Sequence, residues 1–102
     1  MTHVVINLSA AAEEDIGNIV QFIAQDDPRM AGRFHHDLDQ CLDRLRAFPA
    51  LGNATKHGNI ELRSIRVSER FRRYLIHYRI LGGERLRIIR IVHSARDVAK
   101  LL

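Results

Sequence analysis

Hydrophobic and polar residues follow two different patterns in the first part of the chain. Residues 4–8 form a short run that is rich in β-branched side chains, which favours a strand. Ser9 then suits a helix N-cap, and the apolar residues that follow recur at the helical period of about 3.6 residues. These residues are Ala12, Ile16, Ile19, Val20 and Ile23. The pattern predicts a strand followed directly by an amphipathic helix of about four turns.

A second helix is predicted after the break at residues 26–28. Asp27 suits its N-cap, and Pro28 suits the first helical position, where a missing N–H has no consequence. Pro49 and Gly52 end the helix. Its predicted buried face consists of Ala31, Phe34, Leu38, Cys41, Leu42, Leu45 and Phe48. Because the link between the two helices is so short, we expect them to form an antiparallel hairpin.

The segment after the helices changes from loop to strand. Residues 49–59 are rich in turn formers and are expected to be a loop. Residues 60–67 are expected to be one strand. A bulge near Ser64 is predicted because the apolar residues change parity between Leu62 and Ile65.

Two further strands complete the predicted sheet. The first runs from about Phe71 to Leu81, and the second contains the dense β-branched run at 87–92. Residues 95–102 are expected to be a short helix or a tail. The resulting order is β-α-α-β-β-β, a single α+β domain over residues 1–102 with a helical hairpin packed on one face of a largely antiparallel sheet.

Gly82 and Gly83 between these strands are a strong hairpin signal. A two-residue loop would place Ile76 opposite Ile89, Tyr74 opposite Ile91, Tyr78 opposite Arg87, and Arg72 opposite His93. The predicted core face is then Tyr74, Ile76, Tyr78, Ile80, Ile89 and Ile91. The predicted outward face is Arg73, Leu75, His77, Arg79, Leu86, Ile88, Arg90 and Val92. A longer loop would move the strands by one residue and turn every side chain to the other face.

Composition places limits on this domain. With 102 residues and 46% hydrophobic content, the chain fits one small globular domain. No apolar run approaches the ~20 residues of a membrane span, so a soluble cytoplasmic protein is expected. Cys41 is the only cysteine, and its position in a helical pattern predicts a packed core thiol.

Charge is distributed unevenly along the chain. Residues 1–55 contain four Arg or Lys and eight acidic residues, a net charge of −4. Residues 56–102 contain twelve Arg or Lys and four acidic residues, a net charge of +8. The basic half could bind nucleic acid or an acidic protein segment, or could simply be a solvated face.

The ionisable residues leave one catalytic hypothesis open. The sequence has no phosphate-binding glycine loop, no zinc-ligand spacing and no serine nucleophile motif, so no cofactor or metal is expected. A metal-free ribonuclease would need a base, charge-stabilising arginines and an acid. Glu61 or His93 could be the base, and His77 or His93 the acid. Candidates for charge stabilisation are Arg63, Arg79 and Arg96. In the alternative reading, Arg96 and Asp97 form a local ion pair, and His93 is a strand-end residue.

Several short motifs, in order along nearly the whole chain, resemble the ParE branch of the RelE/ParE toxin superfamily. The most specific is His93-Ser94-Ala95-Arg96-Asp97. The others are Leu8-Ser9 with Ala12 and Asp15-Ile16, Asp27-Pro28 with Ala31 and Phe34, Leu45, Phe48-Pro49 with Gly52, Leu62-Arg63 with Ile65, and Tyr74-Leu75-Ile76 to Tyr78-Arg79.

This resemblance implies a toxin of a type II toxin–antitoxin system. It implies a cognate ParD-like antitoxin that wraps and neutralises the toxin, and DNA gyrase as the target whose inhibition arrests growth. The chain lacks the C-terminal tyrosine and paired lysines of typical RelE-like nucleases, which favours the ParE reading. The alternative is a RelE-like endoribonuclease that cleaves mRNA, and only this alternative requires nucleic acid as a partner. Its catalytic candidates are His93, Arg96, Arg79 and Glu61. The residues expected to bind a partner protein are Arg63, Arg73, Leu75, His77, Arg79, Leu86, Ile88, Arg90 and Val92.

Overall fold

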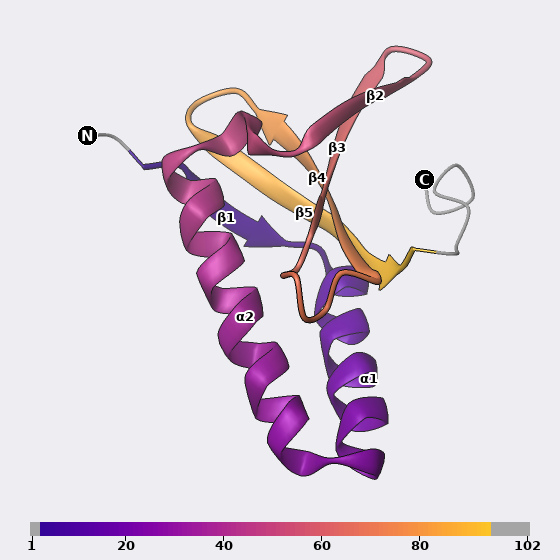
Figure 1. Ribbon diagram of the computed structural model, residues 1–102. Helices are drawn as coiled ribbons and strands as arrows, with labels where there is room; N and C mark the ends of the chain where they lie inside the picture. Colours follow the sequence, from indigo (N-terminus) through magenta and orange to yellow (C-terminus); the bar gives the residue numbers. More distant parts are fainter. Residues whose placement is uncertain (1–2, 95–102) are drawn as a thin grey trace.

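Two helices lie against one face of a five-stranded sheet (Figure 1). The computed structural model describes residues 3–94. Its elements are β1 (Val5–Leu8), α1 (Ala10–Asp26), α2 (Pro28–Ala47), the short 3₁₀ helix η1 (Pro49–Leu51), β2 (Asn53–His57), β3 (Ile60–Arg66), β4 (Tyr74–Leu81) and β5 (Arg85–His93). Neither helix of this described part is long and apolar enough to cross a membrane.

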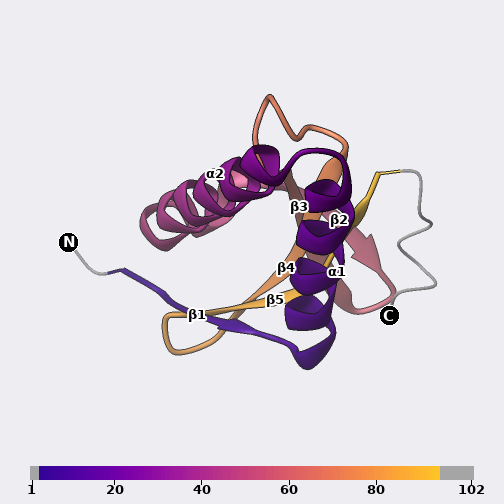
Figure 2. The same ribbon diagram turned by 90° about the horizontal axis from the view of Figure 1, so that it is seen from below.

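The strand order in the sheet is β1-β5-β4-β3-β2. β1 runs parallel to β5, and the other three pairings are antiparallel. Figure 2 shows the two helices side by side over this sheet. The predicted α+β fold and the β-α-α-β-β-β order are therefore confirmed, with β2 as an additional strand.

The two helices begin as the sequence predicts. The Ser9 hydroxyl oxygen accepts a hydrogen bond from the Ala12 N–H at 3.0 Å. An Asp27 carboxylate oxygen accepts one from the Arg29 N–H at 3.0 Å, with Pro28 at the first helical position. Each cap satisfies an N–H group that the first helical turn leaves without a partner.

The core lies between α2 and the sheet. Six of the seven apolar residues predicted for the inner face of α2 are buried, from Ala31 to Leu45. The seventh, Phe48, is 62% exposed because it caps the helix with a non-helical backbone. Phe34 packs edge-to-face against Phe71 and Tyr74, with ring centroids 5.2 and 5.6 Å apart.

Cys41 is the core thiol that the pattern predicts. It is fully buried, and its Sγ donates to the Arg66 carbonyl oxygen at 3.7 Å. Burial raises the pKa of this thiol, which disfavours the reactive thiolate.

The predictions for residues 49–67 need two corrections. Residues 53–57 form the edge strand β2, not a loop, and pair with β3 in continuous register. β3 also has no bulge at Ser64, because its pairings with β2 and β4 are regular there. The change of parity arises because Leu62 and Ile65 face opposite sides of the sheet. Leu62 is 2% exposed, so both sides of the sheet contain buried apolar residues.

The predicted register of the β4–β5 hairpin is wrong. Leu81 pairs with Arg85, so the loop has three residues, and its last residue, Glu84, has a positive φ of 61°. The pairing also shifts between His77 and Tyr78, with Ile89 as the extra residue of a bulge. The observed partners are Tyr74 with His93, Ile76 with Ile91, Tyr78 with Ile88, and Arg79 with Arg87.

The new register changes which β5 side chains enter the core. Leu86 and Ile88, predicted to face outward, are fully buried in the core together with Ile91. Ile89, predicted to face the core, is only half-buried. On β4, the core-facing assignment of Ile76 and Tyr78 is confirmed. Ile80, predicted for the same face, is 44% exposed near the hairpin loop.

Tyr78 fastens η1 to the sheet. Its hydroxyl donates to the Pro49 carbonyl oxygen at 2.7 Å and accepts from the Gly52 N–H at 2.8 Å. A Cβ at residue 52 would lie 2.7 Å from the Tyr78 hydroxyl, so only glycine fits there without a shift. Arg63 adds hydrogen bonds from its guanidinium to the Ala50 and Gly52 carbonyl oxygens at 3.0 and 2.8 Å.

Candidate functional site

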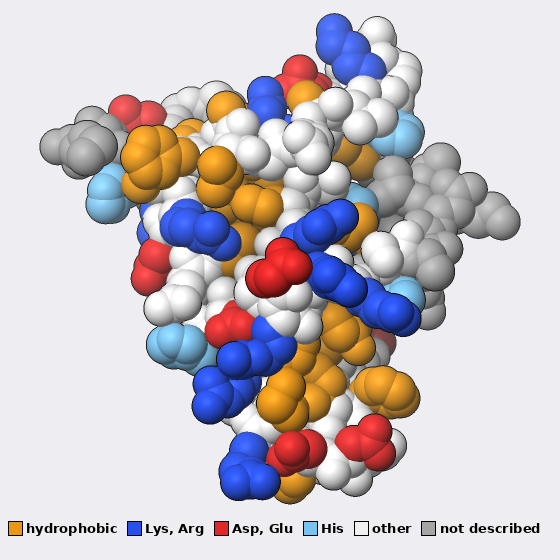
Figure 3. Space-filling model, viewed as in Figure 1, with side chains coloured by type: hydrophobic (Ala, Val, Ile, Leu, Met, Phe, Trp, Pro, Cys, Tyr) orange, Lys and Arg blue, Asp and Glu red, His pale blue; other side chains and the backbone are white. Residues whose placement is uncertain are grey.

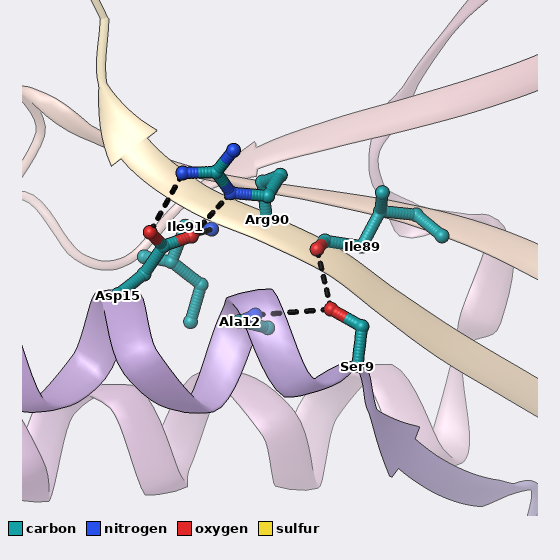
Figure 4. Close-up of polar contacts among 6 residues, drawn as sticks. All are labelled: Ser9, Ala12, Asp15, Ile89, Arg90 and Ile91. Carbon is teal, nitrogen blue, oxygen red and sulfur yellow. Dashed lines mark hydrogen bonds and ion pairs between the residues drawn. The ribbon is translucent and has the colours of Figure 1, made fainter. Parts of the chain in front are cut away.

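β5 is held by different partners along its length. Its first half, Arg85–Ile88, pairs with β1 on one side and β4 on the other. Beyond Ile88, residues at the start of α1 replace β1. The Ser9 N–H donates to the Ile88 carbonyl oxygen at 2.9 Å, and the Ser9 hydroxyl donates to the Ile89 carbonyl oxygen at 2.6 Å (Figure 4).

Asp15 of α1 continues this replacement. Its carboxylate accepts hydrogen bonds from Nε and Nη2 of Arg90, both at 2.8 Å, and from the Ile91 N–H at 2.9 Å (Figure 4). The hydrogen bond with Asp15 raises the pKa of Arg90 further above its already high value. Asp15 therefore ties α1 to the second half of β5 with charge-assisted hydrogen bonds.

A groove of ≈520 Å³ opens between α1 and the ends of β4 and β5. Phe22 on α1 is 65% exposed at this groove, and Tyr74 and Val92 line the strand side. Figure 3 shows hydrophobic side chains over the helices, below a band of Lys and Arg side chains. Asp15 and Arg90 are already paired with each other, and the groove offers polar and apolar surface in similar amounts.

His93 lies at the end of the same groove. Its ring is edge-to-face with that of Tyr74, with centroids 5.9 Å apart. The ring contact orients an exposed imidazole at the mouth of the groove.

The face of the sheet opposite the helices carries part of the predicted partner-binding set. Leu75, His77 and Arg79 alternate along β4 with the core-facing residues. Arg79 pairs across the hairpin with Arg87, and neither forms an ion pair with a carboxylate of the described residues. Like charges placed opposite each other on a sheet are destabilising, so this face suits an anionic partner.

The rest of the predicted partner-binding set is dispersed. Arg73 is exposed in the turn before β4, and Val92 is 5% exposed beside the groove. Arg90 is paired with Asp15. Leu86 and Ile88 belong to the core and cannot contact a partner, because the three-residue loop turns them inward.

The candidate catalytic residues do not converge on one place. Glu61 pairs with Arg63 at 3.2 Å, and Arg63 holds the η1 backbone on the helix side. Arg79 lies on the opposite face of the sheet, and His93 lies at the α1 groove. Arg96 lies outside the described residues. Within residues 3–94 there is also no group of three or more His, Cys, Asp or Glu that could hold a metal ion.

The sequence identified three residues of the groove as site residues, Arg90, Val92 and His93, but it missed those that α1 contributes, Asp15 and Phe22 among them. Asp15 is an ordinary acidic residue in the first part of a helix, and nothing local shows that β5 needs a hydrogen-bond acceptor there. Phe22 could have been identified from the sequence. It lies outside the apolar stripe of its helix, and a large apolar side chain on the polar face of a helix indicates a contact surface.

Comparison with known proteins identifies the family. A sequence model of the family described as "ParE toxin of type II toxin-antitoxin system, parDE" matches residues 6–98. A solved structure, "Chromosomal ParDE TA system from P. aeruginosa", has a similar fold with a TM-score of 0.69 at 17% sequence identity. The match covers 89% of this chain and 96% of that one. No curated protein matches the chain. Since the family match spans most of the sequence, the chain belongs to the ParE toxin family of type II toxin–antitoxin systems.

Proposed function

We propose that this chain acts in the cytoplasm as a toxin that arrests growth by binding DNA gyrase, and that a ParD-like antitoxin neutralises it. The observation that carries the proposal is the ParE family match over residues 6–98. The similar ParDE fold supports the same assignment at the level of architecture.

The dispersed candidate residues favour binding over catalysis. General acid–base chemistry needs its groups within hydrogen-bond reach of one substrate. Glu61, Arg79 and His93 lie at three separate places, and Glu61 is already paired with Arg63. A toxin that acts by occupying a surface of its target requires no such convergence.

Two surfaces suit the antitoxin. The α1 groove offers Phe22 and neighbouring apolar side chains to an amphipathic segment. The outward face of β4 and β5 offers Leu75 together with Arg79 and Arg87, which form no ion pair with a carboxylate of residues 3–94. An acidic, amphipathic antitoxin segment would satisfy both the apolar and the cationic side chains.

Expression of the chain in bacteria tests the toxin function. Growth should stop on induction and recover when the neighbouring antitoxin gene is expressed with it. The purified, antitoxin-free protein should inhibit supercoiling by purified gyrase. Full supercoiling at high toxin excess would contradict the gyrase proposal, and RNA cleavage by the same sample would support the nuclease alternative.

Two exposed phenylalanines provide a matched test of the antitoxin surface. Phe22 and Phe48 are 65% and 62% exposed, but only Phe22 lines the groove. We expect Phe22→Ser to weaken antitoxin binding by about tenfold or more, as expected for an aromatic anchor, and Phe48→Ser to leave it unchanged. Titration calorimetry with the antitoxin would measure both. Equal effects of the two variants would place the antitoxin elsewhere.

A further inference from the structure

A second, smaller pocket lies on the face of the sheet opposite the helices. Its volume is ≈220 Å³. It is lined by Thr55 and His57 of β2, Leu62, Arg63 and Ser64 of β3, and His77 of β4. We call it the His57–His77 pocket. It is separate from the α1 groove, with which it shares no lining residue.

Both imidazoles in this pocket have unused hydrogen-bonding atoms. His77 is only 7% exposed, and its ring makes no hydrogen bond to a described residue. The Nε2 atom of His57 is buried and has no hydrogen-bond partner among residues 3–94. A buried polar atom without a partner is destabilising, so the His57 Nε2 atom, in the same cavity as the nearly buried ring of His77, points to a hydrogen-bonding ligand at this place.

The charges around His77 indicate which kind of ligand the pocket would bind. The His77 side chain faces His57 of β2 and the uncharged Ser64 of β3. On β5, His77 pairs with Arg90, whose guanidinium is bound by Asp15. Its neighbour on the same face of β4 is Arg79, and Arg63 lines the pocket although its guanidinium is bound to the η1 backbone on the helix side. No carboxylate of residues 3–94 lines the pocket, so every ionisable side chain that these residues contribute is cationic or becomes cationic on protonation.

This arrangement disfavours protonation of His77. Burial lowers the pKa of His77, and the neighbouring His57 lowers it further. A bound anion would reverse both effects, because each protonated ring would donate a charge-assisted hydrogen bond to it. Hydroxyl groups of Thr55 and Ser64 could donate as well.

We propose that the His57–His77 pocket binds a phosphate-type oxyanion and that binding places protons on the two imidazoles. The step is proton uptake from solvent, with no covalent change. The volume exceeds the ~30 Å³ share of one water several-fold, which leaves room for a phosphate group. The phosphate could be free or could belong to a nucleic acid. Arg79 lies two residues along β4, roughly 6.6 Å away, where it could contact a second phosphate of a backbone. The proposal does not depend on gyrase or on the antitoxin.

Histidine ring signals in NMR spectra of the free toxin would test this site. Inorganic phosphate is added at constant ionic strength, with chloride as the balancing anion. We expect saturable shifts of the His57 and His77 signals, and an apparent pKa of His77 that is higher by about one unit at saturation. Phosphate should then bind at least tenfold tighter at pH 6 than at pH 7.5. The exposed His35 and His36 serve as internal references. Shifts equal to those of His35 and His36, or no shifts at all, would overturn the proposal.

Matched variants localise the effect. His57→Gln and His77→Gln should each reduce phosphate affinity at pH 6 by tenfold or more, and His36→Gln should not change it. Circular dichroism melting confirms that each variant is folded. If His77→Gln fails to fold, the half-buried His57 still decides the question. Unchanged phosphate affinity in folded His57→Gln would exclude the site.

A short single-stranded DNA distinguishes the two phosphate sources. If the source is nucleic acid, the oligonucleotide should compete with inorganic phosphate, and Arg79→Gln should weaken only the oligonucleotide. If the source is free phosphate, the oligonucleotide should not compete. Binding of an acidic peptide at the pocket without any binding of phosphate would contradict the proposal.

Discussion

The two halves of β5 show two ways of holding a strand in a sheet. Residues 85–88 have a strand on each side and side chains that alternate between core and solvent. Residues 89–93 lose β1 and are held on that side by Ser9 and Asp15 of α1. The first half is a regular part of the scaffold, and the second half lines the α1 groove.

This difference explains why the groove lies where it does. A neighbouring strand covers a sheet edge along its whole length, whereas two side chains satisfy only particular backbone atoms. Space remains between α1 and the end of β5, and Phe22 and His93 occupy its rim. The end of β1 therefore determines the start of the surface that we propose for the antitoxin.

The largest expected effect distinguishes the core residue Ile88 from its neighbour Ile89. Ile88 is fully buried, whereas Ile89 is the half-buried bulge residue. Ile88→Ala should reduce the free energy of unfolding by about 3–4 kcal/mol, and Ile89→Ala by about 1 kcal/mol. Urea denaturation followed by circular dichroism would measure both. A larger loss of stability for Ile89→Ala than for Ile88→Ala would instead support the register of a two-residue loop.

The next effect concerns the attachment of the second half. Asp15→Asn keeps the shape but removes the charge that binds Arg90, and should destabilise the fold by about 2–3 kcal/mol because the pair is largely shielded from solvent. Asp43→Asn breaks the exposed pair with Arg46 and should change stability by less than about 0.5 kcal/mol. Thermal melts in low and high salt would compare them. Equal losses would mean that the Asp15 pair contributes no more than a surface ion pair.

A smaller effect is expected at Ser9, where the two halves meet. Ser9→Ala removes both the helix cap and the hydrogen bond to the Ile89 carbonyl oxygen. The expected loss is about 1–2 kcal/mol. Ser9→Thr keeps the hydroxyl and should recover most of it. Hydrogen exchange should show faster opening of residues 89–91 in Ser9→Ala alone, and uniform protection would argue against the role of Ser9 at this edge.

The smallest effect is a pH dependence from His77, which pairs with Arg90 in the second half. Because its pKa is lowered in the folded state, the unfolded chain binds more protons below its ordinary pKa of about 6.5. In chloride buffer, stability should therefore be independent of this group above pH 6.5 and should fall as the pH decreases below it. His77→Gln should flatten that part of the curve. Denaturant midpoints between pH 5 and 8 would test this, and an unchanged slope would exclude His77 as its source.

The sequence predicts those elements whose signals are local. Ser9 and Asp27 cap their helices, and the buried face of α2 follows its apolar spacing from Ala31 to Leu45. These features depend on residues within a few turns of one another. The helical hairpin and the overall order of elements could therefore be derived before the structure.

The errors arise where a distant or subtle partner decides the outcome. Gly82 and Gly83 suggest a two-residue loop, but Glu84 adopts a left-handed conformation and adds a third. β2 has no apolar alternation, because four of its five residues are exposed at the edge of the sheet. These errors affected the predicted site residues more than the predicted fold. One residue of register moved Leu86 and Ile88 from the predicted binding face into the core.

The parallel pairing of β1 with β5 also affects when the protein can fold during synthesis. β1 is the first strand made, and its partner residues follow 80 positions later. The Asp15 contacts with Arg90 and Ile91 span a similar distance along the chain. Contacts this far apart in sequence slow folding, and they cannot form until the distant segment has been translated. A ribosome-bound chain that has not reached β5 therefore has neither a closed sheet nor an α1 groove, so its synthesis leaves an interval before a complete toxin exists.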